Sequence, residues 1–295
     1  MIPLQKQKET TINSKKDRFM VFKNSKQFLT EFIAVLLTLI IFGVPFYFVI
    51  INAVKNQSES ALLNMKWPSS FHIIDNLKAV FSEHDGMLFR AFYNSSLLTV
   101  FSLILLVIVG SMAGFVLQRK ISKASSFFNF LIIAGLIIPP AVVPTIWVLN
   151  LLGLFKTMPG IVLIEVALSF PFTVLLYKSF MVTIPREIDE AALIDGCGSI
   201  RLFFNIIFPL LKPVTSTIVV LTAVNIYNDF VNPLYFYPGA ENVTLQLTLY
   251  NFTSMYQTEW NLLFTNILVI SLPMLILFLF FSKKIVAGMT AGAIK

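Results

Sequence analysis

The sequence is poor in the residue types that build soluble catalytic and metal-binding sites. Its 295 residues include one cysteine and two histidines, and only 13% are charged. A single cysteine excludes an internal disulfide and any cysteine-based metal cluster. Soluble domains contain about 25% charged residues. The low charge therefore indicates a protein that lies in a membrane.

Several nucleotide-binding and catalytic patterns are also missing. The Gly-x-x-x-x-Gly-Lys-Ser/Thr loop does not occur, which excludes ATP binding by that route. The zinc-protease pattern His-Glu-x-x-His is absent, because His72 and His84 stand twelve residues apart. No set of nucleophile, base and carboxylate is evident either. We therefore expect no catalytic residue, metal or cofactor in this chain.

Apolar runs occupy most of the sequence, which is 57% hydrophobic and contains 30 phenylalanines. About twenty apolar residues cross a bilayer as a helix, and a proline within such a helix predicts a kink. The third run is expected to be broken by Pro139, Pro140 and Pro144. In the second run, Gly110 and Gly114 have the spacing that permits close helix contact, although this spacing is common by chance. We predict an all-α integral membrane protein with six transmembrane helices, at residues 32–54, 94–118, 127–152, 160–181, 214–230 and 261–281.

The distribution of basic residues predicts the orientation. A net charge of +7 could suggest nucleic acid, but the basic residues stand in loops beside apolar runs, where topology explains them. Six spans place both termini on one side, and 17 of the 22 Lys and Arg residues fall there. Because basic residues prefer the cytoplasmic side, we expect both termini to be cytoplasmic. The other five are Lys55, Lys66, Lys78, Arg90 and Lys156.

Three regions follow from this topology. Residues 1–31 form a basic N-terminal tail, residues 32–282 the membrane domain, and residues 283–295 a cytoplasmic tail. The first 31 residues are polar and basic without an apolar core, so we expect no cleavable signal peptide.

A polar interruption at about residues 183–213 separates the fourth and fifth spans. It predicts two short helices joined by Gly196, which suits a helix end that needs positive φ. Pro185 can stand in the first turn of the first helix, and Ser199 can cap the second helix, which runs to Pro209. Acidic residues in the first turns suit the positive end of the helix dipole; they are Glu187, Asp189 and Glu190.

This segment resembles the cytoplasmic EAA loop of ABC importer permeases. That loop reads Glu-Ala-Ala, three residues, Gly, nine residues, Ile, and Leu-Pro after one more position. The matching residues here are Glu190, Ala191, Ala192, Gly196, Ile206 and Pro209. Phe208 replaces the usual Leu, and Cys197 stands where a small Ala is common. The alternative is an amphipathic helix that lies in the membrane interface.

The resemblance implies a coupling surface for a separate ATPase. In the family the first helix of the loop docks in a cleft of the ATPase subunit and moves with it. The coupling residues here are then Glu190, Ala191, Ala192, Asp195 and Gly196. Two ATP-binding partner subunits would use the ATP and magnesium. The glycine would set the angle between the helices, and the alanines would allow a close fit.

A second stretch resembles sugar permeases of the maltose type. Asn225-Ile226-Tyr227-Asn228-Asp229-Phe230, followed by Pro233-Leu234, is similar to their Trp-Asn-Glu/Asp-Phe…Pro-Leu segment, with Tyr227 at the Trp position. This implies the second of two permease subunits in a carbohydrate importer of the bacterial cell membrane. The expected partners are a homologous permease and an extracellular solute-binding protein that delivers the sugar.

Five polar residues are candidates for the substrate path. Asn225, Asn228 and Asp229 are spaced to share one helix face, with Tyr227 close by. They could instead cap the helix end. Glu165 lies inside the fourth span, where a central carboxylate costs about 2.5–3.5 kcal/mol, and either a substrate path or structural hydrogen bonding accounts for it.

Other functions stay open at this point. A permease of the same architecture could carry a peptide or a polyamine, although the sugar-type segments argue against it. A membrane enzyme is disfavoured by the missing catalytic sets, and a stand-alone channel would not need an EAA loop.

Overall fold

The computed structural model describes residues 25–83, 85–252 and 258–291, and their regular elements are all helices. The longer helices are α2 (Ser25–Thr38), α3 (Val44–Ala53), α5 (Ile73–Ser82), α6 (Met87–Arg119), α7 (Lys123–Ile137), α8 (Val142–Leu151), α9 (Met158–Met181), α10 (Glu187–Ile194), α13 (Lys212–Tyr227) and α15 (Trp260–Ala291). The short ones are η1 (Leu39–Gly43), α4 (Gln57–Ser60), α11 (Ser199–Arg201), η2 (Leu202–Ile207), α12 (Phe208–Leu210), α14 (Val231–Phe236), η3 (Ala240–Asn242) and η4 (Gln246–Phe252).

Four helical stretches among the described residues are long and apolar enough to cross a membrane: Phe28–Ala53, Met87–Arg119, Met158–Met181 and Trp260–Phe280. A fifth crossing is possible if Ser199–Leu210 and Lys212–Tyr227, which meet at 76°, are counted as one span. These stretches correspond to the first, second, fourth, sixth and fifth predicted spans.

The third predicted span, at residues 127–152, is not one helix. Two shorter apolar helices, α7 and α8, take its place, separated at residues 138–141. Pro139 and Pro140 explain the break, because the residue before a proline is pushed out of the helical region and proline lacks an N–H donor. Pro144, by contrast, lies within α8.

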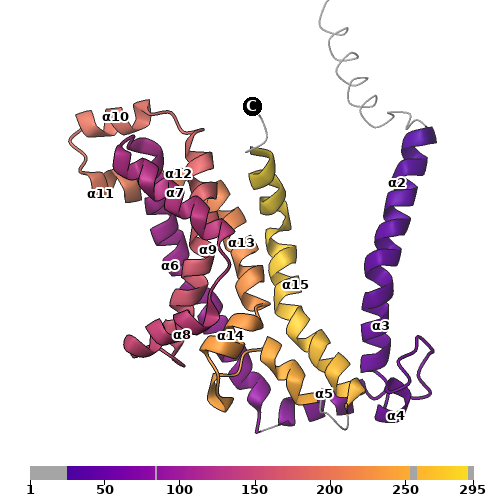
Figure 1. Ribbon diagram of the computed structural model, residues 1–295. Helices are drawn as coiled ribbons and strands as arrows, with labels where there is room; N and C mark the ends of the chain where they lie inside the picture. The colour runs from indigo at the N-terminus through magenta and orange to yellow at the C-terminus, as the bar shows by residue number, and fades with distance from the viewer. Residues whose placement is uncertain (1–24, 84, 253–257, 292–295) are drawn as a thin grey trace, which may run out of the picture.

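The helices form a bundle with two distinct ends (Figure 1). At one end, here named the α10 end, lie α10, α11 and α12 together with the start of α7. The opposite end, named the α5 end, carries α4, α5 and α14. The first turn of α2 and the last turns of α15 also lie toward the α10 end. This layout places the polar segment at 183–213 outside the body of the bundle.

Helices α6 and α9 approach each other closely at two glycines. A Cβ atom on Gly110 would stand 2.6 Å from Thr173 Cγ2, and one on Gly114 would stand 2.7 Å from Tyr177 Cβ and 3.2 Å from the backbone nitrogen of Lys178. No real Cβ fits at such distances. The spacing of the two glycines, which permits close helix contact but also occurs by chance, here stands at a real close contact between α6 and α9.

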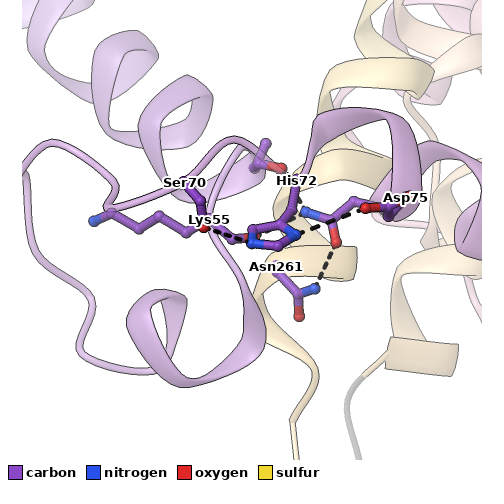
Figure 2. Close-up of polar contacts among 7 residues, drawn as sticks. Lys55, Ser70, His72, Asp75 and Asn261 are labelled. Carbon is purple, nitrogen blue, oxygen red and sulfur yellow. Dashed lines mark hydrogen bonds and ion pairs between the residues drawn. The ribbon is translucent and has the colours of Figure 1, made fainter.

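A buried hydrogen-bond network joins α3, α5 and α15 at the α5 end (Figure 2). Asn76 Nδ2 donates to the carbonyls of Ala53 and Lys55 at 2.8 and 2.9 Å, and Asn261 Nδ2 donates to Asn76 Oδ1 at 2.8 Å. The Lys55 ammonium donates to the Asn64 carbonyl at 2.7 Å. Burial lowers the pKa of Lys55, while the Glu59 carboxylate acts in the opposite direction.

His72 lies at the rim of this network and contacts two polar neighbours. Its Nε2 is 2.8 Å from Ser70 Oγ, and its Nδ1 is 3.7 Å from Asp75 Oδ2 (Figure 2). Both contacts lie at the start of α5.

The first membrane helix stands apart from the rest of the bundle (Figure 1). No side chain between Phe28 and Ile50 is buried, and burial begins only at Ile51, Asn52 and Ala53, where α3 meets α15. The side chains from Phe28 to Phe42 are therefore exposed, whereas α3 contacts α15, where the Phe48 and Phe264 ring centroids are 5.4 Å apart.

The structure describes part of each predicted tail, residues 25–31 and 283–291. Helix α15 continues to Ala291, past the predicted span end at residue 281 and into the predicted tail. Residues 1–24 and 292–295 lie outside the described residues. Helix α2 begins at Ser25, within the predicted N-terminal tail.

Candidate functional site

The segment at 183–213 folds as two helices joined by a tight glycine turn, as predicted. Gly196 has φ +79°, its N–H donates to the Leu193 carbonyl at 3.1 Å, and the Cys197 N–H donates to the Ala192 carbonyl at 2.9 Å. This pair of bonds is the Schellman ending of a helix, which favours glycine at the left-handed position. A Cβ on Gly196 meets nothing within 4 Å. The glycine is therefore needed for its backbone conformation and not for space.

Two details of the predicted helix starts were wrong. Arg186 is the N-cap of α10, so Pro185 precedes the helix instead of standing in its first turn. Gly198 takes the N-cap position of the second helix, and Ser199 is its first helical residue without a capping bond. A short extended step after the glycine turn leaves Gly198, and not Ser199, with the φ and ψ of an N-cap.

The second helix runs from Ser199 to Leu210 through a π-helical stretch. In that stretch the Phe208 N–H donates to the carbonyl of Phe203, five residues back. Pro209 follows at once and has no N–H of its own, so its i−4 bond is missing. The π-helical turn is wider than an α-helical turn, and it lies where the proline interrupts the regular hydrogen bonds of the helix. Leu211 then marks the 76° bend into α13.

The predicted coupling residues differ in their exposure to solvent: some are exposed and others are buried within this chain. Glu190, Ala191, Asp195, Gly196 and Pro209 are exposed on the α10 end. Ala192 is only 5% exposed and packs within this chain, and Ile206 is half-buried. The small side chain of Ala192 thus serves the packing of α10 on the chain itself, whereas Ala191 offers the outward small surface.

An apolar cluster holds the helix pair to the bundle. The cluster joins the last turns of α9 and the start of α13 to both helices of the pair. Its buried members are Tyr177, Met181, Ile184, Ala192, Leu202, Phe203, Ile207, Leu211, Val214 and Ile218. Tyr177 also donates its hydroxyl to Thr215 Oγ1 at 3.0 Å. Displacement of the helix pair would therefore be transmitted directly to the two membrane helices.

An ion pair that sequence reasoning missed fixes α10 to the end of α6. Arg119 Nε lies 2.6 Å from Asp189 Oδ2, and both side chains are 13% exposed. The Arg119 guanidinium also donates to the Ile184 carbonyl at 3.1 Å. Asp189 was considered only for its helix dipole effect, because a pairing across 70 residues leaves no local signal.

A hollow of about 770 Å³ lies beside the second helix on the exposed end. Its lining is mostly apolar and consists of Gly198, Ser199, Ile200, Arg201, Phe204 and Asn205. Ile200 is 77% exposed in this hollow. The helix pair therefore presents both acidic and apolar surface to the outside of the bundle.

The structure separates the five substrate-path candidates. Asn225 is exposed on α13. Tyr227 is 5% exposed and donates its hydroxyl to the Ile270 carbonyl at 3.3 Å, so it belongs to the core. Asn228 is exposed and accepts a bond from Gln246 Nε2 at 3.0 Å.

Asp229 does not share a helix face with the asparagines, contrary to the prediction. Helix α13 ends at Tyr227, and Asp229 Oδ1 instead accepts the N–H of Val231 at 2.8 Å at the start of α14. Asn232 bonds to Asp229 Oδ2 and also donates to Glu165 Oε1 at 3.2 Å. Glu165, 4% exposed, is thereby part of a hydrogen-bonded link between α9 and α14. Within the described residues, no group of three His, Cys, Asp or Glu side chains could hold a metal.

Known proteins with similar sequences are transport permeases. The chain is 32% identical over 272 residues to the "Probable starch degradation products transport system permease protein AmyC" of Thermoanaerobacterium thermosulfurigenes, covering 92% of this chain and 97% of that one. It is 34% identical over 259 residues to the "Melibiose/raffinose/stachyose import permease protein MelC" of Bacillus subtilis, covering 85% and 91% of the two chains.

The fold is similar to that of a chain in the crystal structure of a bacterial ABC transporter involved in the import of the acidic polysaccharide alginate. The TM-score is 0.73 at 18% sequence identity, over 89% of this chain and 98% of that one. Residues 106–290 match the family described as "Binding-protein-dependent transport system inner membrane component". This range includes the helix pair, the ion pair and the polar link of Glu165. The chain belongs to this family of membrane components of binding-protein-dependent transport systems.

Proposed function

We propose that this chain is a permease subunit of an ATP-driven importer that moves a sugar or oligosaccharide across the bacterial cell membrane. In this proposal it crosses the membrane six times, with α7 and α8 together forming the third crossing and both termini in the cytoplasm. The α10 end faces the cytoplasm. The distribution of Lys and Arg supports this orientation, since the great majority fall on the side of the termini and of α10.

The observation that carries the proposal is the exposed helix pair at the α10 end. It combines an acidic and small outward surface, at Glu190 and Ala191, with a hollow beside Ile200. It is also rigidly attached to α6, α9 and α13 through the Arg119–Asp189 ion pair and the apolar cluster. A surface that is exposed on one side and anchored on the other can contact the ATP-binding subunits and transmit their movement to the membrane helices.

The exposed apolar surface of the first span supports a second membrane subunit. Large apolar side chains of α2 and η1 are exposed; Phe28, Phe32, Val35 and Leu39 are each at least 57% exposed. A homologous permease that packs against these residues would complete the assembly and enclose a path between the two subunits. The solute-binding protein would then dock at the α5 end, outside the cell.

The sugar assignment rests on the relatives. AmyC and MelC carry the names of starch degradation products and of melibiose, raffinose and stachyose, and AraQ of Bacillus subtilis that of arabinooligosaccharides. Asn225 and Asn228 are the substrate-path residues that stay exposed, and amide groups suit sugar hydroxyls. Tyr227, Asp229 and Glu165 would support this wall through their internal hydrogen bonds.

Reconstitution tests the proposal. The chain is co-expressed with its neighbouring permease and an ATP-binding subunit, and ATP hydrolysis is measured with and without sugar-loaded binding protein. We expect stimulation by the loaded binding protein. Glu190→Ala and Gly196→Leu should reduce stimulated hydrolysis and transport at least about tenfold, which corresponds to about 1.4 kcal/mol of coupling, without loss of the assembled membrane subunits.

Two matched variants separate conformation from bulk. Gly196→Asn keeps a residue that tolerates positive φ and should stay close to the native protein. Gly196→Ala adds only a Cβ, which meets nothing within 4 Å, at a backbone position with φ +79° that alanine disfavours, so it should lower coupling through conformation alone. A complex that forms without any ATP-binding subunit and transports normally with Gly196→Leu would refute the proposal.

A further inference from the structure

A basic pocket lies among α6, α7, α9 and the start of α10. Its volume is about 270 Å³, and three cationic side chains line it: Lys120, Lys178 and Arg186. They come from three separate parts of the chain, and no carboxylate is among the lining residues. None of the three forms either of the ion pairs found within the described residues. Three positive charges around one hollow repel one another unless an anion is present.

Hydrogen-bond donors for an anion line the same pocket. Ser122, Ser125 and Ser126 line the pocket at the start of α7, near the positive end of its helix dipole. The Ser122 and Ser125 hydroxyls lie 3.0 Å apart, and Ser126 Oγ donates to the Ser122 carbonyl at 3.3 Å, so a bound anion would exchange these internal hydrogen bonds for its own. The Lys178 ammonium is held by Asn129 Oδ1 at 2.7 Å, which fixes its direction. Arg186 is positioned by the Gln118 carbonyl at 3.4 Å. The pocket thus has the charge and the donors that a phosphate group requires.

An apolar groove of about 740 Å³ adjoins the basic pocket and shares Leu117 with it. The groove runs between α6, α7 and α9, and its lining is almost wholly apolar. Several lining side chains face outward; Met112, Val116, Phe128 and Leu131 are each more than 40% exposed. A membrane-facing groove that ends in a cationic pocket matches a molecule with an anionic head and a hydrocarbon tail.

We propose that an anionic glycerophospholipid binds here, with its phosphate in the basic pocket and an acyl chain in the groove. Basic pockets between membrane helices on the cytoplasmic side are suited to anionic headgroups. The assignment to the cytoplasmic leaflet rests on the proposed orientation. Because Arg186 caps α10, a bound lipid would also hold the start of the coupling helix pair in place.

Native mass spectrometry of the assembled complex tests the proposal. The complex is purified from nanodiscs that contain equal amounts of phosphatidylglycerol and phosphatidylcholine, without solute or ATP. We expect retained phosphatidylglycerol, and an apparent affinity about 30-fold weaker for the double variant Lys120→Gln/Lys178→Gln, because each basic residue near an anionic headgroup contributes a factor of about five. The control Lys123→Gln/Lys212→Gln removes the same charge from exposed positions outside the pocket and should retain the lipid.

The apolar half of the site has its own test. Val116→Trp fills the groove from an exposed position and should lower lipid retention while the subunits still assemble. Equal retention by the double variant and its control would overturn the proposal. So would displacement of the lipid by millimolar inorganic phosphate combined with no effect of Val116→Trp, which would mean a phosphate-ion site only. Loss of the second permease with Val116→Trp would assign the groove to that subunit instead. Because lipid retention is measured without solute or ATP, a loss of lipid binding is distinguished from a loss of transport.

Discussion

At the scale of residues, the ion pair of Arg119 and Asp189 determines where α10 sits. Both groups are largely removed from water, and each is the charge partner of the other. Taking one partner away leaves the other charge uncompensated, which costs more than the pair itself contributes. The same reasoning does not apply to Glu187 and Glu190, which are exposed on the same helix.

We predict that Asp189→Asn loosens α10 by about 3 kcal/mol and lowers ATP hydrolysis that is stimulated by the binding protein. Hydrogen exchange of residues 187–194 in the purified complex measures the loosening directly. Glu187→Gln is the matched control, because it removes the same charge from an exposed position in the first turn. If the two variants exchange at the same rate, the ion pair does not hold the helix.

Residue roles were predictable from the sequence only where they depend on near neighbours. The left-handed conformation of Gly196 follows from a helix end and is confirmed. The position of Tyr227 was not foreseen, because its partner Ile270 is 43 residues away. Asp229 was predicted to lie on α13 but follows the end of that helix, where its carboxylate accepts the N–H of Val231 at the start of α14.

At the scale of elements, α6 and α9 form the tightest contact in the bundle. Gly114 lies against the backbone of α9, at Lys178, as well as against Tyr177. Backbone cannot rotate away as a side chain can, so an added methyl group must push the two helices apart.

We predict that Gly114→Ala destabilises the chain by about 1–3 kcal/mol, the usual cost of overpacking. Gly43→Ala is the matched control, because a Cβ there meets only the flexible Leu39 side chain at 3.6 Å, and it should be neutral or stabilising by up to about 1 kcal/mol. Thermal unfolding of the purified complex compares the two. An unchanged thermal unfolding midpoint for Gly114→Ala would contradict the prediction, because the helices would then accommodate the methyl group without loss of stability.

Element positions were largely predictable because apolar length is a strong signal. The first, second, fourth and sixth predicted spans correspond to single long helices. The third was predicted as one broken span, yet the chain forms two helices of 15 and 10 residues, each too short to cross alone. Its prolines were visible in the sequence, but the direction of α8 after the break depends on tertiary packing.

At the scale of the whole molecule, the two ends of the bundle have different chemistry. The α10 end combines basic loops, the helix pair and the basic pocket. The α5 end carries a buried amide network around Asn76 and the loop of η3, which is joined to α6 where Asn94 donates to the Glu241 carbonyl at 2.8 Å. We assign the first end to the ATP-binding subunits and the second to the solute-binding protein.

Site-specific photocross-linking measures this assignment most directly. A photoreactive residue is placed at exposed Ala191 in α10 or, as the matched position at the other end, at exposed Glu241 in η3, within the reconstituted importer. The account predicts that position 191 captures an ATP-binding subunit, and that position 241 captures the solute-binding protein and no ATP-binding subunit. Capture of an ATP-binding subunit from position 241, with none from position 191, would contradict both the orientation and the coupling surface.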